Sequence, residues 1–161
     1  MKFHKILVPV DFSPCSLEAY RAGVTLIRQF GGELLVFHVI DARILESLTE
    51  IQMVKTDQLI KALHKKARLQ FRSFLSKERD NEKVRRIIVT GIPFQEIIKV
   101  ARLEKVNLIV MGRYGGTGEM EKIFFGSTAE KVVRVAPCAV LSIPLVENSA
   151  RSRVSQKHDD R

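Results

Sequence analysis

A glycine-rich loop in the second half of the chain holds the residues best suited to bind a ligand. Gly112 to Gly118 contains four of the nine glycines, and Gly126 and Ser127 follow it. Glycines let a backbone approach a ligand closely because they carry no side chain. Ser127-Thr-Ala-Glu130 has the spacing of a capping box and predicts a helix that begins at Ser127. Because the N–H groups at a helix N-terminus suit phosphate, the pattern predicts a phosphate site; the alternative is a surface loop before a well-capped helix.

The loop matches neither of the two common phosphate-binding motifs. It lacks Gly-Lys-Ser/Thr, so it is no Walker A loop, and it does not follow the first strand, where a GxGxxG fingerprint belongs. Catalytic patterns are missing as well: there is no Ser-His-Asp set and no carboxylate pair near the loop, and Asp11 is the one candidate general base. We therefore expect a binding module and not a dedicated enzyme.

Five short apolar runs, separated by helical patterns, form the elements that would position these residues. Because the runs are continuously apolar, they predict strands covered on both faces, although Pro9 argues mildly against a central place for the first. The predicted strands are Lys5 to Asp11, Glu33 to Asp41, Val84 to Thr90, Asn107 to Met111 and Ala139 to Ile143. The predicted helices run from Pro14 to Phe30, Asp57 to Lys77, Phe94 to Leu103 and Ser127 to Val135, with a partly helical connection from Ala42 to Thr56.

This alternation predicts an α/β fold with a parallel sheet, helices on both faces and right-handed crossovers. Ligands of such sheets bind outside the carboxyl ends of the strands, where the strand order reverses. Four predicted strand ends carry Asp11, Val39, Thr90 and Met111-Gly112. These ends are therefore the expected location of a ligand site.

Length and composition describe an ordinary globular chain. The 161 residues predict a single domain, which we place at 1–146, followed by a polar, disordered tail at 147–161. No apolar run is long enough to span a bilayer and no secretory signal is readable, so the expected location is the cytoplasm. Cys15 and Cys138 lack CxxC spacing, and we interpret them as unpaired thiols.

The basic character of the chain is concentrated in one segment. The net charge is +9, and residues 55–86 hold 11 basic against 4 acidic residues. A stripe of Lys61, Lys65, Arg68 and Arg72 lies on one face of the predicted helix there. We favour a solvated helix face over a nucleic-acid site, because no aromatic residues interleave the stripe for base stacking.

Taken together, the motifs resemble those of the universal stress protein family, of the single-domain type, over about residues 3–144. The landmarks, specific in this order, are Lys5-Ile-Leu-Val-Pro-Val-Asp11, His38-Val-Ile-Asp41, Gly91-Ile-Pro93, Leu108-Ile-Val-Met-Gly112 and Phe125-Gly-Ser127. The resemblance implies an open five-stranded, Rossmann-like α/β fold of the adenine-nucleotide-binding type. It also implies a homodimer paired through the last strand, residues 139–143.

The resemblance further implies an ATP site, with or without Mg²⁺, and at most slow ATP hydrolysis. Pro9, Val10 and Asp11 would line the adenosine side, with Asp11 near the ribose, and Val39 would touch the adenine. Met111 and Gly112 would lie under the nucleotide, and Gly126, Ser127 and Thr128 would hold phosphates. Arg113, Gly115 and Gly116 complete the candidate set; Arg113 either pairs with phosphate or is solvated, and Asp11 alternatively caps the turn into the first helix.

One departure from the family pattern affects the middle of this site. Members that bind ATP carry Gly-x2-Gly-x9-Gly-Ser/Thr. Here Gly112 and Gly115 have the first spacing, but ten residues, not nine, separate Gly115 from Gly126. The loop thus contains one extra residue. The rival interpretations are a nucleotide-free dimeric interaction protein of the same fold, and nucleic-acid binding through the basic helix 57–77.

Overall fold

A computed structural model describes residues 3–52, 56–76, 84–115 and 125–145. Five parallel strands form one open sheet in the order β3-β2-β1-β4-β5. This confirms the predicted fold class. The strands are β1 (Lys5–Pro9), β2 (Glu33–Asp41), β3 (Val84–Gly91), β4 (Leu108–Gly112) and β5 (Ala139–Ile143). The helices are α1 (Pro14–Phe30), α2 (Ala42–Gln52), α3 (Thr56–Leu75), α4 (Pro93–Leu103) and α5 (Ser127–Val135).

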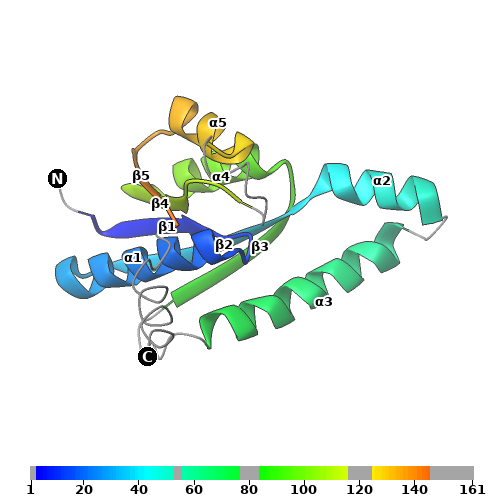
Figure 1. Cartoon of the computed structure of the whole chain (residues 1–161), viewed down its shortest axis with the longest axis horizontal. Helices are drawn as coiled ribbons and strands as arrows, with labels where there is room; N and C mark the ends of the chain where they lie inside the picture. The colour runs from blue at the N-terminus through cyan, green and yellow to red at the C-terminus, as the bar shows by residue number, and fades with distance from the viewer. Residues whose placement is uncertain (1–2, 53–55, 77–83, 116–124, 146–161) are drawn as a thin grey trace, which may run out of the picture.

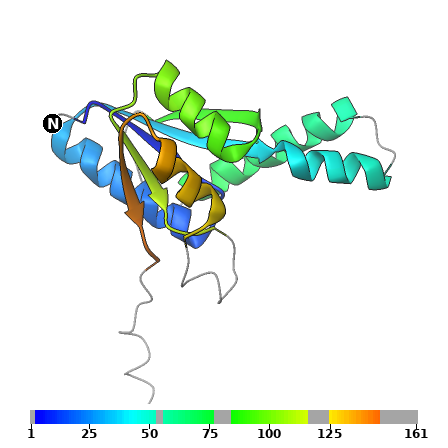
Figure 2. The same cartoon turned by 90° about the horizontal axis from the view of Figure 1, so that it is seen from above.

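Helices cover both faces of the sheet (Figure 1). Ile6 and Val8 of β1 pack into a core with α1 and α3, whereas Leu7 packs into a second core with α4 and α5. Because successive strand residues point to opposite faces, only a continuous apolar run can fill both cores. Helix α2 and the part of α3 that lies beside it project beyond the sheet (Figure 2), whereas Phe71 and Phe74 in the last turns of α3 pack in the core.

Helix α1 begins and ends at the predicted residues, Pro14 and Phe30. The Ser13 side chain accepts a hydrogen bond from the Ser16 N–H, and Pro14 occupies the first turn. Gly31 ends the helix with φ 75°, and its N–H donates to the Ile27 carbonyl at 2.8 Å. The positive φ is the conformation that favours glycine at a helix C-terminus.

One detail of the prediction is wrong. Pro9 lies in β1, which is the central strand and not an edge. The N–H of the next residue, Val10, donates to β2, so the nitrogen of Pro9 faces β4 on the other side. The pairing of β4 with β1 covers only Ile6 and Leu7, so β4 needs no hydrogen bond from Pro9 and the proline is tolerated.

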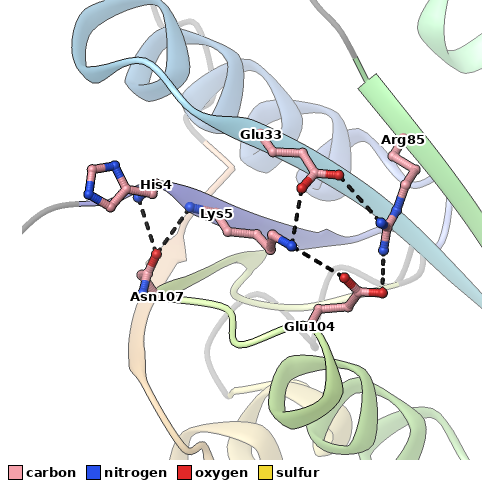
Figure 3. Close-up of polar contacts among 6 residues, drawn as sticks. All are labelled: His4, Lys5, Glu33, Arg85, Glu104 and Asn107. Carbon is pink, nitrogen blue, oxygen red and sulfur yellow. Dashed lines mark hydrogen bonds and ion pairs between the residues drawn. The ribbon is translucent and has the colours of Figure 1, made fainter.

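A closed ring of four charges ties the amino ends of the strands together (Figure 3). Lys5 Nζ lies 3.2 Å from Glu33 and 3.4 Å from Glu104, and Arg85 pairs with the same two carboxylates. The ring raises the pKa of Lys5 and lowers the pKa of Glu104. Next to it, the Asn107 side chain accepts the Lys5 N–H at 3.1 Å. These contacts hold β1, β2, β3 and the end of α4 together, and they leave the carboxyl ends free for a site.

The predicted tail at 147–161 lies outside the described residues. Within the described residues, no helix combines the length and apolarity needed to cross a membrane.

Candidate functional site

A cavity of about 710 Å³ opens at the carboxyl ends of β1, β2 and β4. It lies where the strand order reverses, because the chain extends from β1 to β2 on one side and to β4 on the other. Its size is within the range of small-molecule sites. The structure brings together in its lining ten of the residues predicted from sequence: Pro9, Val10, Asp11, Val39, Met111, Gly112, Gly115, Gly126, Ser127 and Thr128.

Asp11 places a carboxylate at the mouth of this cavity. Its Oδ1 accepts hydrogen bonds from the Ser13 N–H at 3.0 Å and the Ser13 hydroxyl at 2.5 Å. Asp11 therefore caps the turn into α1, as the alternative interpretation held. Its Oδ2 faces the glycine loop, because a Cβ built on Gly115 would lie 2.5 Å from that oxygen. One carboxylate thus fixes the turn and also presents an oxygen toward the cavity.

Gly112 marks a second close approach, at the end of β4. A Cβ there would lie 3.0 Å from the Cys15 Sγ and 3.1 Å from the Cys15 carbonyl carbon. The Cys15 thiol is buried and donates to the Ile143 carbonyl at 3.3 Å. Cys15 therefore packs the first turn of α1 against the ends of β4 and β5, and glycine at 112 makes that packing possible.

The N-terminus of α5 points unsatisfied donors at the cavity. Gly126 is the N-cap residue and provides no side-chain hydrogen bond, so the predicted capping box, with Ser127 as the cap, is wrong. The Gly126 N–H donates to the Arg113 carbonyl at 3.0 Å, and the first intrahelical bond is from Glu130 to Gly126. The N–H groups of Ser127 and Thr128 make no hydrogen bond within the described residues. They are the donors that an anion would meet.

One predicted site residue, Arg113, does not join the lining, and another, Gly116, lies outside the described residues. The Arg113 guanidinium lies over the Phe125 ring, 5.1 Å from its centre, and Nε is buried without a hydrogen-bond partner among the described residues. Arg113 therefore contacts a lining residue but does not line the cavity itself. Gly116 and the extra loop residue fall in 116–124, outside the described residues.

Sequence reasoning missed several residues that line the cavity. They are Ser16, Phe37, His38, Pro93, Ile97, Tyr114, Phe125 and Ala129. His38 and Pro93 belong to the family motifs quoted above, so those motifs could have pointed to them. Phe37, Ile97 and Ala129 had no such signal, because they look like ordinary core residues.

An aromatic cluster links the cavity to α3. Phe12, directly after Asp11, has φ 66°, a left-handed conformation that is uncommon for a residue with a bulky side chain. Its ring centre lies 4.4 Å from that of His38 and 5.2 Å from that of Phe71 in α3. Packing of this ring holds the strained turn in place.

Burial of the His38 ring disfavours its charged form. Its Nδ1 lies 2.8 Å from the Val10 carbonyl, so Nδ1–H donates there. Burial lowers the pKa of His38, and this effect outweighs the hydrogen bond and the nearby Asp11 carboxylate, which raise it. The ring at this strand end is therefore protonated less readily than an exposed histidine.

Comparison with known proteins identifies the family. Residues 2–144 match the Universal stress protein family. Universal stress protein MJ0531 of Methanocaldococcus jannaschii is 32% identical over 150 residues, which cover 88% of this chain and 82% of that protein.

Solved structures agree with this assignment. The structure of MJ0577 from Methanocaldococcus jannaschii superposes with a TM-score of 0.78 at 31% identity and covers 92% of this chain and 100% of that one. A universal stress protein from Archaeoglobus fulgidus, solved in complex with dAMP, shares the fold with a TM-score of 0.55 at 20% identity, over 89% of this chain and 99% of that one. On these matches and on the fold, the chain belongs to the universal stress protein family.

Proposed function

We propose that this chain is a regulatory module that binds an adenine nucleotide, ATP, in the 710 Å³ cavity. The observation that carries the proposal is the N-terminus of α5. Its first N–H groups make no hydrogen bond within the described part of the chain, and they face a cavity with a carboxylate at its mouth. Helix N-termini favour phosphate, and a carboxylate suits ribose hydroxyls. The Archaeoglobus fulgidus relative, solved with dAMP, supports an adenine nucleotide as the ligand class.

In the proposed complex, the apolar lining takes the base and the loop takes the phosphates. Val10 and Val39 contact the adenine, Asp11 Oδ2 accepts from the ribose, and the N–H groups of Ser127 and Thr128 donate to phosphate oxygens. Met111 and Gly112 lie under the nucleotide. ATP binds with or without Mg²⁺, which its phosphates would carry into the site.

A pair of substitutions at Ser127 tests the phosphate contacts by calorimetric titration with ATP. Ser127 is the first helical residue, a position where proline fits a helix, and Gly126 has φ −60° and ψ 143°, which suit a residue before proline. Ser127→Pro removes one N–H donor, so we expect ATP affinity to fall about tenfold, as for a charge-assisted hydrogen bond. Ser127→Ala keeps the N–H and serves as the control, with affinity within about twofold of the parent.

If both variants bind ATP as tightly as the parent does, the phosphates do not bind at the N-terminus of α5. Failure of the parent to bind any nucleotide would instead favour a nucleotide-free interaction protein of the same fold.

We also propose a homodimer through β5. This edge strand pairs only with β4 among the described strands, its residues are half-buried or exposed, and Leu141 is 39% exposed. Pairing two β5 strands would satisfy both open edges and cover Leu141. Light scattering should give twice the 18.3 kDa chain mass, and Leu141→Glu should shift it toward 18.3 kDa. A parent mass of 18.3 kDa at micromolar concentration contradicts the dimer.

A further inference from the structure

The second sheet edge, at β3, borders a basic groove with no role in the site above. The groove has a volume of about 670 Å³ and lies between α3 and β3. Four cations line it, together with a floor of apolar side chains and one histidine: Lys65, Arg68, Arg72, Arg86, Leu69, Phe71, Ile88 and His64. Leu69 is 57% exposed, so part of this floor is open to water.

The cations of the groove have no acidic partners in the described part of the chain. Arg85 and Arg86 provide the contrast, because they are neighbours on one strand and point to opposite faces. Arg85 is held by Glu33 and Glu104 on the α4 side (Figure 3). Arg86 points to the α3 side, where Arg68 and Arg72 add charge of the same sign. An unneutralised cluster of this kind attracts an anionic ligand.

The backbone of β3 offers a second recognition element. Among the described strands β3 pairs only with β2, so its other edge carries unpaired N–H and C=O groups. Its apolar residues Ile87, Ile88 and Val89 stay half-buried, whereas the apolar residues Ile6, Leu7 and Val8 of the central strand β1 are fully buried. An extended peptide can add to such an edge as a further strand.

The groove and the edge match each other in length. His64 Nε2 lies 3.1 Å from Thr90 Oγ1, which fixes α3 against the carboxyl end of β3. From His64 to Arg72 the helix advances about 12 Å, and from Thr90 back to Arg86 the strand covers about 13 Å. About four residues of an added strand fit along this length, with alternate side chains facing the cations.

We propose that the β3 edge and the α3 groove bind an extended acidic segment of a partner protein by strand addition. Acidic side chains of the segment face Lys65, Arg68 and Arg86, and the alternating apolar side chains pack beside Ile87 and Val89 on the opposite face. A second copy of this chain is a poor occupant, because two basic β3 edges would repel each other. Nucleic acid would use the cations but leave the backbone edge and the apolar floor unused.

The test uses a fluorescent octapeptide of alternating Glu and Val as the probe, with anisotropy as the readout. We expect saturable binding to the full chain. The pair Arg68→Glu and Arg86→Glu, made together, should weaken it at least about tenfold, because it replaces two attractions with two repulsions. Arg102→Glu with Lys131→Glu makes the same charge change on exposed positions of α4 and α5, which cover the opposite face of the sheet. This control should stay within about threefold of the parent, since distant exposed charges are screened.

Two further probes separate strand addition from simple charge attraction. An octapeptide of the same sequence with alternate backbone nitrogens methylated cannot form the ladder and should bind at least about tenfold more weakly. Hydrogen exchange of the Val84–Gly91 amides should slow when the unmodified peptide binds. An oligonucleotide of similar length should bind more weakly than the peptide.

The proposal is overturned if the octapeptide does not bind, if methylation has no effect, or if the oligonucleotide binds more tightly with the same dependence on Arg68 and Arg86. ATP titration of the Arg68→Glu and Arg86→Glu protein should match the parent. The outcome is therefore independent of the nucleotide proposal.

Discussion

The contact between Asp11 and the glycine loop gives the sharpest prediction about the nucleotide site. A Cβ on Gly115 would lie 2.5 Å from Asp11 Oδ2, whereas an ordinary contact needs about 3.4 Å. Gly115→Ala must therefore displace the carboxylate or the loop by nearly an ångström. Asp11 Oδ1 is already held by two bonds from Ser13, so movement of the carboxylate strains them as well.

We expect Gly115→Ala to raise the Kd for ATP about 10- to 100-fold. This corresponds to the loss of one hydrogen bond to a charged group, about 1.5–3 kcal/mol. The free energy of unfolding should change by less than about 1 kcal/mol, because the loop lies at the surface. Titration calorimetry and urea denaturation measure the two quantities on the same samples.

A double-mutant cycle with Asp11→Ala identifies the cause. If the clash with the carboxylate is responsible, Gly115→Ala should add little further loss of ATP affinity in the Asp11→Ala background. Binding of inorganic triphosphate should be less affected by either change, since it has no ribose. Strictly additive losses in the cycle would refute the reasoning, because they would mean that the two positions act separately.

Three further changes probe the frame around the site. Gly32→Ala should destabilise the fold more than Gly31→Ala in urea denaturation. Both residues have positive φ, but only at Gly32 would the Cβ overlap a neighbouring backbone carbonyl. Equal losses of stability in the two variants would contradict this. Burial lowers the pKa of His38, so the unfolded chain binds a proton there more readily than the folded chain does. The free energy of unfolding should therefore fall as the pH drops below about 6.5, and His38→Asn should reduce this fall. An unchanged pH profile in this variant would exclude His38 as the source. Arg85→Gln should lower the free energy of unfolding slightly, and this loss should shrink in high salt. In the parent, stability is lost at low pH as Glu104 is protonated, and the variant should lose less of its stability over that pH range. A loss that does not depend on salt would indicate packing instead of charge.

Local patterns were enough to predict most of the fold. The continuous apolar runs predicted all five strands within two residues of their ends, and the predicted limits of α1, Pro14 to Phe30, match the structure. These features depend on contacts within a few residues, or on burial of whole runs. Pro9 could not be placed from sequence, because its tolerance depends on how few residues of β4 pair with β1.

The candidate site was predictable where it follows from strand ends. Asp11, Val39 and Gly112 lie at the cavity because parallel strands bring their carboxyl ends to one edge. The N-cap of α5 was misplaced by one residue, since a capping box and a helix with Gly126 as N-cap share the same local sequence. The contact of Phe12 with Phe71 joins residues far apart in the chain and has no local signal.

The central claim is that ATP occupies the cavity at the carboxyl ends of β1, β2 and β4. The most direct test is an amide ¹H–¹⁵N NMR titration of the full chain with ATP. Our account predicts saturable shifts, with the largest at Asp11, Gly112, Gly115 and Ser127, and little change along α3. Absence of shifts at millimolar ATP, or largest shifts on α3 and β3, would contradict it.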